Sequence, residues 1–176
     1  MERSHPLVEL ARRTIGSYVR EGKRPSLPPA LPAEMQQPAG AFVTIYRHGQ
    51  LRGCIGTIHP TQASVAEEVI ENAVAAASRD PRFSAVESHE LEDLEIKVDV
   101  LTKPVPIDGV EDLDPKRYGL IVQSLAHPWK RGLLLPDLEG IDTAEKQLFW
   151  TRHHKAGITD PEEPVELYRF EVQRHT

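Results

Sequence analysis

The pattern of apolar positions along the chain predicts three amphipathic helices. In the first, side chains that can face a core recur three and four positions apart. These residues are Leu7, Leu10, Ala11, Thr14, Ile15 and Tyr18. Ser4 is a suitable N-cap, Pro6 suits the first turn of a helix, and Gly22 is a typical stop. The sequence therefore predicts a helix between Ser4 and Gly22.

Two further helices show the same periodicity and plausible caps. In TQASVAEEVIENAVAAASRD, Ser64 and Glu67 have the spacing of a capping box. The apolar stripe of this helix consists of Val65, Val69, Ala73, Val74 and Ala77. The third helix is predicted from about Asp142 to Ala156, with Glu145 completing a capping box and Gly157 following its C-terminus.

Strand character appears between these helices. The segments that favour strands are 41–46, 50–58, 94–101, 119–124, 131–136 and 165–172. His48 and Gly49 form a turn signal between the first two, which predicts a hairpin. In LEIKVDVL apolar and polar residues alternate, which predicts a strand with one buried face and one solvent-exposed face. The order of elements predicts an α+β fold with an antiparallel or mixed sheet covered by helices.

Length and composition suit one globular domain over residues 1–176, with a smaller lobe as an option. The chain has 39% hydrophobic and 27% charged residues. Residues 23–40 are rich in proline and read as an extended connector. A formal net charge of −6 without basic clusters argues against nucleic-acid binding. One cysteine, no secretory pattern and no long apolar stretch predict a cytoplasmic protein outside the membrane.

The single cysteine lies in LRGCIG, residues 51–56, on the return strand of the hairpin. Regular alternation would place Arg52, Cys54, Gly56 and Ile58 on one face, and Leu51, Gly53, Ile55 and Thr57 on the core face. A guanidinium about 6–7 Å along the strand would lower the pKa of the thiol. Gly56 would leave space on the thiol side, and Gly53 would let another backbone come close.

Two interpretations of this strand stay open. Cys54 is either an inert packed residue or a thiol that reacts or contacts a ligand. In SRDPRF, Asp80 and Arg82 either form a surface ion pair at a helix end or close over a site beside the hairpin. The histidines lack metal-ligand spacing, so no metal site is predicted, and the sequence identifies no cofactor.

Several segments together resemble the AMMECR domain family, and in particular the prokaryotic group called AmmeMemoRadiSam system protein A. They are PAGAFVTIYRHGQLRGCIGTI, VIENAVAAASRDPRF, LEDLEIKVDVL, GLIV, RGLLLP, KAG and LYRFEV, and they follow the order of the family. The stretch RGLLLPDL departs from the usual GTFLPQVW-like pattern. The resemblance implies an α+β fold with a larger and a smaller subdomain and the cysteine motif at or near the groove between them.

The resemblance also implies candidate site residues. Arg52 and Cys54 are the catalytic candidates. The binding candidates are Gly53, Ile55, Gly56, Asn72, Asp80, Arg82 and Phe83. Through the family, Memo-like and radical SAM proteins become candidate partners in a shared pathway with no assigned substrate.

Two functions are therefore compatible with the sequence. In the first, Cys54 is the centre of a small-molecule or catalytic site, with Arg52 activating the thiol and backbone N–H groups around it binding an anionic or carbonyl group. In the second, the chain is a non-catalytic interaction module of the same pathway, because no complete acid–base or metal constellation is present. An open cleft at Cys54 would favour the first function, and a covered sulfur would favour simple packing.

Overall fold

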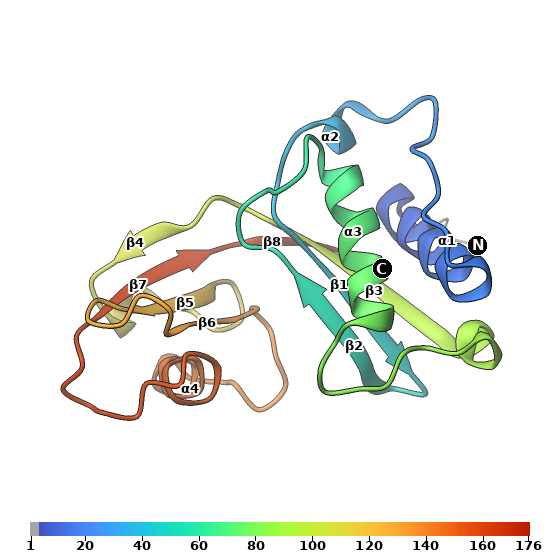
Figure 1. The fold of residues 1–176 in the computed structure, drawn as a ribbon. Coiled ribbons are helices and arrows are strands. Elements are labelled where there is room, and N and C mark those ends of the chain that lie inside the picture. The colour runs from blue at the N-terminus through green and yellow to red at the C-terminus, as the bar shows by residue number, and fades with distance from the viewer. Residues whose placement is uncertain (1–3) are drawn as a thin grey trace. The chain divides into compact units, whose positions relative to one another are not determined.

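A computed structural model describes residues 4–176, and its ribbon is shown in Figure 1. The elements of the N-terminal part are α1 (Pro6–Glu21), α2 (Ala33–Gln36), β1 (Ala41–Arg47), β2 (Gln50–Gly56), α3 (Val65–Ser78), the 3-10 helix η1 (Ser88–Asp93) and β3 (Leu94–Leu101). Those that follow are β4 (Val105–Ile107), the 3-10 helix η2 (Val110–Asp112), β5 (Gly119–Ser124), β6 (Arg131–Leu134), α4 (Ala144–Trp150), the π-helical turn η3 (Thr151–Lys155), β7 (Val165–Phe170) and β8 (Val172–His175).

The chain divides into two compact units, each built on its own sheet. Of the described residues, the larger unit contains 4–101 and 173–176, and the smaller contains 102–172. The strand order is β2-β1-β3-β8 in one sheet and β4-β7-β5-β6 in the other. The strands of the second sheet pair antiparallel, as do β1 with β2 and β1 with β3. The predicted α+β class with a larger and a smaller subdomain is confirmed, with two sheets in place of one.

The second sheet arises because the last predicted strand is divided. β7 ends at Phe170 and pairs with β5, whereas β8 begins at Val172 and belongs to the first sheet. Between them, the backbone N–H of Glu171 donates to Oγ1 of Thr102 at 2.8 Å, and its carbonyl accepts from the N–H of Thr102 at 2.9 Å. These two bonds fix the point at which the continuous strand leaves one sheet for the other.

In the larger unit, α1 and α3 lie side by side and α3 packs on β1 and β2 (Figure 1). The apolar stripes predicted for both helices are buried except for Tyr18, which is half-buried, and Val43, Ile45 and Val98 are buried in the sheet. Ser64 caps α3 by accepting a hydrogen bond from the N–H of Glu67. The N-cap of α1 is His5, whose Nδ1 accepts from the N–H of Leu7 at 3.2 Å, so the prediction of Ser4 was wrong by one residue.

The hairpin forms as predicted, but its second strand carries a bulge. His48 and Gly49 both have positive φ, 51° and 77°, as a two-residue hairpin turn of the right twist requires. Ile45 pairs with Gly53 and Tyr46 pairs with Leu51, so Arg52 is the additional residue. The bulge reverses the faces beyond it. Leu51, expected in the core, is 37% exposed.

The smaller unit departs from prediction at three places. β4, which contains Pro106, was not among the predicted strands. It lies at a sheet edge, where a strand tolerates a proline because the missing N–H can face away from the neighbouring strand. The N-cap of α4 is Thr143 and not Asp142. The helix also changes to a π turn after Trp150, and Gly157 then ends it with φ 70°, as predicted.

Candidate functional site

The segment that follows α3 lies along the free edge of β2 and contacts the backbone of Cys54. The N–H of Cys54 donates to Oδ2 of Asp80 at 2.9 Å, and the carbonyl of Cys54 accepts from Nη2 of Arg82 at 3.4 Å. Because β2 is an edge strand, these two groups would otherwise face solvent or another chain. Asp80 and Arg82 therefore take the place that a neighbouring strand would occupy.

Asp80 and Arg82 also bind each other closely. Nε of Arg82 donates to Oδ1 of Asp80 at 3.0 Å, and Nη2 donates to Oδ2 at 2.8 Å. The Asp80 carboxylate is buried, and the hydrogen bond from Arg82 is the main cause that lowers its pKa to about 2. The guanidinium stands 5.4 Å from the centre of the Phe83 ring. In this turn the ionised side chains of Asp80 and Arg82 hold each other and the edge of β2 by hydrogen bonds.

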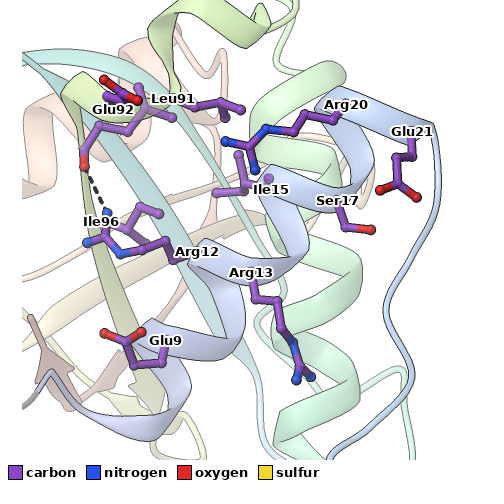
Figure 2. Close-up of a pocket in the computed structure, with 12 residues that line it drawn as sticks. Glu9, Arg12, Arg13, Ile15, Ser17, Arg20, Glu21, Leu91, Glu92 and Ile96 are labelled. Atoms are coloured by element: carbon purple, nitrogen blue, oxygen red, sulfur yellow. Dashed lines mark hydrogen bonds between the residues drawn. The ribbon is translucent and has the colours of Figure 1, made fainter.

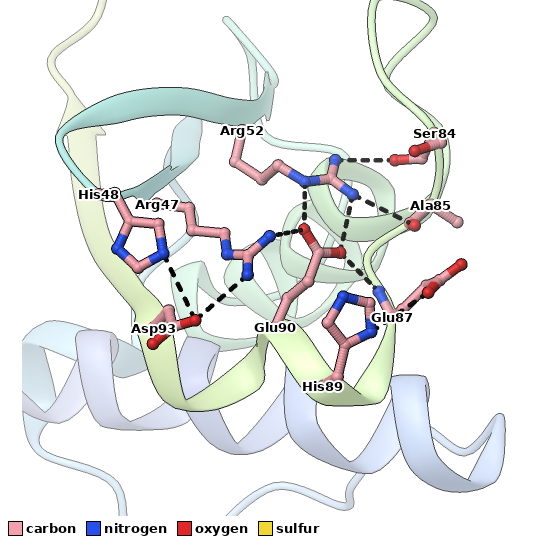
Figure 3. A network of polar contacts seen from close by, with 9 residues as sticks. All are labelled: Arg47, His48, Arg52, Ser84, Ala85, Glu87, His89, Glu90 and Asp93. Carbon is pink, nitrogen blue, oxygen red and sulfur yellow. Dashed lines mark hydrogen bonds and ion pairs between the residues drawn. The ribbon is translucent and has the colours of Figure 1, made fainter.

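Arg52 is the centre of a second contact between β2 and the same segment. Its Nε and Nη2 donate to the two carboxylate oxygens of Glu90, each at 2.9 Å, and its Nη1 donates to the carbonyl of Ser84 at 2.8 Å (Figure 3). Arg47 donates to the same carboxylate at 3.1 Å. The N–H of Glu87 donates to it at 2.8 Å and caps η1. These bonds, the one from Arg52 above all, lower the pKa of Glu90 to about 2.

The thiol of Cys54 is partly covered and contacts a hydroxyl of the neighbouring strand. Its Sγ lies 3.1 Å from Oγ1 of Thr44 on β1, and the side chain is half-buried. Burial raises the pKa of this thiol, and the nearby Arg82 guanidinium and the Thr44 hydroxyl only partly oppose that shift. The sequence analysis expected Arg52 to lower this pKa. That expectation was wrong for two reasons. The bulge at Arg52 breaks the alternation that would place Arg52 and Cys54 on one face of the strand, and Glu90 binds the guanidinium of Arg52.

The glycines of LRGCIG serve close packing. A Cβ on Gly53 would lie 2.3 Å from the carbonyl oxygen of Ala76, so this glycine lets α3 approach β2, as the sequence suggested. A Cβ on Gly56 would lie 2.2 Å from the ring of Phe42, so the space expected beside the thiol is filled by that ring. Ile55 packs against the core. The backbone N–H expected to bind a ligand at Cys54 is already bound by Asp80.

Asn72 and the unpredicted Glu68 hold the end of the hairpin to α3. Nδ2 of Asn72 donates to the carbonyl of Ala41 at 2.9 Å. Glu68, with no exposed surface, accepts hydrogen bonds from the Thr57 hydroxyl and from both the hydroxyl and N–H of Thr61. Both residues are buried in α3, beside its apolar stripe. A polar residue at such a position is a signal that was available in the sequence, since buried polar groups need partners.

An open cleft of about 500 Å³ lies between η1, α1 and β3 (Figure 2). Ile15, Leu91 and Ile96 form its apolar lining. Arg12 and Arg20 of α1 stand along it, and Arg20 is directed toward Ile15 and Leu91. Leu91 is the immediate neighbour of Glu90, so the bond between Arg52 and Glu90 fixes one wall of this cleft.

Within residues 4–176 the structure contains no group of three or more His, Cys, Asp or Glu side chains arranged to hold a metal ion. The adjacent His153 and His154 instead stack on Phe149 and Trp150. Among these same residues, no helix has the length and apolar character needed to cross a bilayer.

A sequence model of the AMMECR1 family matches residues 8–175. The chain belongs to the AMMECR1 family. A protein of Thermotoga maritima is 48% identical over 173 residues, which are 97% of each chain. A protein of Clostridium acetobutylicum is 44% identical over 172 residues, which cover 97% of this chain but only 36% of that longer protein.

A solved structure has the same fold. The crystal structure of an uncharacterized protein from Pyrococcus horikoshii matches with a TM-score of 0.85 and 34% identity, over 96% of this chain and 88% of that one.

Proposed function

We propose that this AMMECR1-family chain is a cytoplasmic, non-catalytic recognition module that binds a partner protein. The proposal rests on the contacts that the charged residues of the Cys54 and Asp80 segments make. Arg52, Asp80 and Arg82 all bind groups of their own chain, and the pKa of the one thiol is raised. The cleft between η1, α1 and β3 is a charged surface whose arginines are not taken up by these bonds.

The chemistry of the cleft selects a partner segment with acidic and apolar side chains. Arg12 and Arg20 lie eight residues apart on α1, about 12 Å along the helix axis, and both are exposed. Among residues 4–176, Arg12 donates only through Nη1, to the carbonyl of Leu94 at 3.2 Å, so its other donors are available within this part of the chain. The lining also includes Arg13 and three glutamates, Glu9, Glu21 and Glu92, which require the partner to place its acidic groups against the arginines.

Two findings support partners from the same pathway. The family resemblance associates such chains with Memo-like and radical SAM proteins. The relative in Clostridium acetobutylicum carries this domain as 36% of a longer polypeptide, so there it acts joined to further protein. Two domains that are joined in one polypeptide in one organism are suited to bind each other as separate proteins in a second organism.

The test measures binding of the purified chain to the Memo-like protein of the same cell by isothermal titration calorimetry. Arg20→Glu is expected to weaken binding about tenfold or more, because it reverses a charge at the centre of the contact. Lys103→Glu makes the same change of charge at an exposed site in the smaller unit and serves as the control. Cys54→Ser is expected to bind like the parent chain. Equal affinities for Arg20→Glu and the parent would contradict the cleft as the contact.

A small-molecule or catalytic site centred on Cys54 is the second candidate. One observation favours it: the thiol is only half-buried, and the Arg82 guanidinium acts to lower its pKa. In that case Cys54, Arg52, Gly53, Ile55, Gly56, Asn72, Asp80, Arg82 and Phe83 would form the site. A folded Cys54→Ser variant that loses partner binding or turnover, with Arg20→Glu unaffected, would support this candidate over the first.

A further inference from the structure

The smaller unit contains a separate cavity of about 360 Å³, which is lined neither by the segment around Cys54 nor by the segment around Asp80. Its apolar lining is formed by Leu134 at the end of β6 and by Leu138 and Ile141 in the following loop. The opposite side is formed by Trp150 and His154. Pockets of small ligands are mostly apolar and aromatic with a few polar groups, and this cavity has that composition.

The π turn η3 shapes the aromatic side of this cavity. The N–H of Ala156 bonds the carbonyl of Thr151 at 2.9 Å, five residues earlier, which widens the helix after Trp150. The rings of Trp150 and His154 stack with centroids 4.2 Å apart and planes 28° apart, and Trp150 is 43% exposed. The π turn is the last turn of this helix, which ends at Gly157. The pair presents a flat surface on which a second ring can stack.

The loop on the opposite side is held in an unusual backbone conformation. Asp137 has φ 57°, which is uncommon for a residue with a side chain, and Gly140 has φ 82°. The N–H of Asp137 donates to the carbonyl of Pro115 at 2.8 Å, which fixes the turn. A conformation of this kind costs energy and tends to be kept where it shapes a site.

The charges around the cavity select the ligand. Lys155 lines it and makes no salt bridge with any described residue. Glu139 lines it from the loop and also makes none within the described chain. We propose that this cavity binds a planar aromatic anion, whose ring stacks on Trp150 and His154 and whose carboxylate or phosphate contacts Lys155. This site does not rest on the function proposed above, because it lies wholly within the other unit.

The experiment uses the two indole N–H signals of the full chain in a ¹⁵N NMR titration. The chain has two tryptophans, and Trp129→Phe assigns the signals. The probe is 2-naphthoate, compared with 2-naphthalenemethanol, which has the ring without the charge, and with acetate, which has the charge without the ring. Saturable shifts of the Trp150 signal with 2-naphthoate alone are expected. Lys155→Met is expected to weaken them about tenfold, since a charged hydrogen bond is lost, and Glu139→Gln to leave them equal or stronger.

Trp129 provides an internal control, since it is 76% exposed and does not line the cavity. Equal movement of both indole signals would show non-specific stacking and overturn the proposal. Equal binding of the neutral alcohol, or unchanged binding by a folded Lys155→Met, would overturn the selection for an anion. An unshifted Trp150 signal at saturating 2-naphthoate would overturn the site itself.

Discussion

Glu90→Ala is expected to lower the free energy of unfolding by about 3–5 kcal/mol, the range for removing one partner of a buried ion pair. The Glu90 side chain is 6% exposed and that of Arg52 is 15% exposed. The substitution leaves the Arg52 guanidinium without its two bonds to the carboxylate. It also removes the capping bond from the N–H of Glu87 and so loosens η1. The measurement is urea unfolding followed by circular dichroism.

Asp93→Ala is the matched control for this substitution. Asp93 also accepts a hydrogen bond from Arg47, at 3.3 Å, but its side chain is 41% exposed. Exposed ion pairs contribute little, so a loss of at most about 1 kcal/mol is expected. Equal losses for Glu90→Ala and Asp93→Ala would show that the bond between Arg52 and Glu90 does not hold the segment after α3.

Gly53→Ala is expected to lower the free energy of unfolding by about 3 kcal/mol, at the upper end of the usual cost of overpacking. The added Cβ would stand 2.3 Å from the carbonyl oxygen of Ala76. That oxygen belongs to the backbone of α3, so relief requires the helix and β2 to move apart. Thermal unfolding by calorimetry measures the effect.

Gly16→Ala makes the same chemical change at a helical glycine and should have the opposite sign. Its Cβ would lie 3.4 Å from Nη1 of Arg20, the mobile end of a long side chain. Alanine is favoured over glycine in a helix by roughly 0.5–1 kcal/mol. The close approach of β2 and α3 would be contradicted by a Gly53→Ala variant as stable as the parent chain.

Local patterns in the sequence predicted much of the larger unit. α1, α3, the hairpin and β3 have periodicities and caps that depend on residues a few positions apart, and they form as expected. The bulge at Arg52 has no such local signal, because it depends on the register with β1. It changed the interpretation of the motif, since it exposes Leu51 and directs Arg52 to Glu90.

The sequence indicated which residues lie at the candidate site better than it indicated which contacts they make. Asp80 and Arg82 contact the backbone of Cys54, and they also form the ion pair that the other interpretation of SRDPRF described. Glu90 looked like one acidic residue among several in SHELED, and only the fold buries it beside Arg52. The contact of Thr44 with the thiol of Cys54 could not be predicted either, because it is made between two neighbouring strands. Such partners come from distant parts of the chain, which no spacing in the sequence records.

The central claim is that the signature residues build a framework and do not activate the thiol. The rate of alkylation of Cys54 by iodoacetamide, measured against pH in the folded chain, tests it most directly. We expect slow alkylation at pH 7 and an apparent pKa above the ordinary thiol value of about 8.5, since burial raises the pKa of Cys54. A folded Arg52→Ala variant should show the same pKa. A pKa below 8.5 that rises in Arg52→Ala would contradict the account.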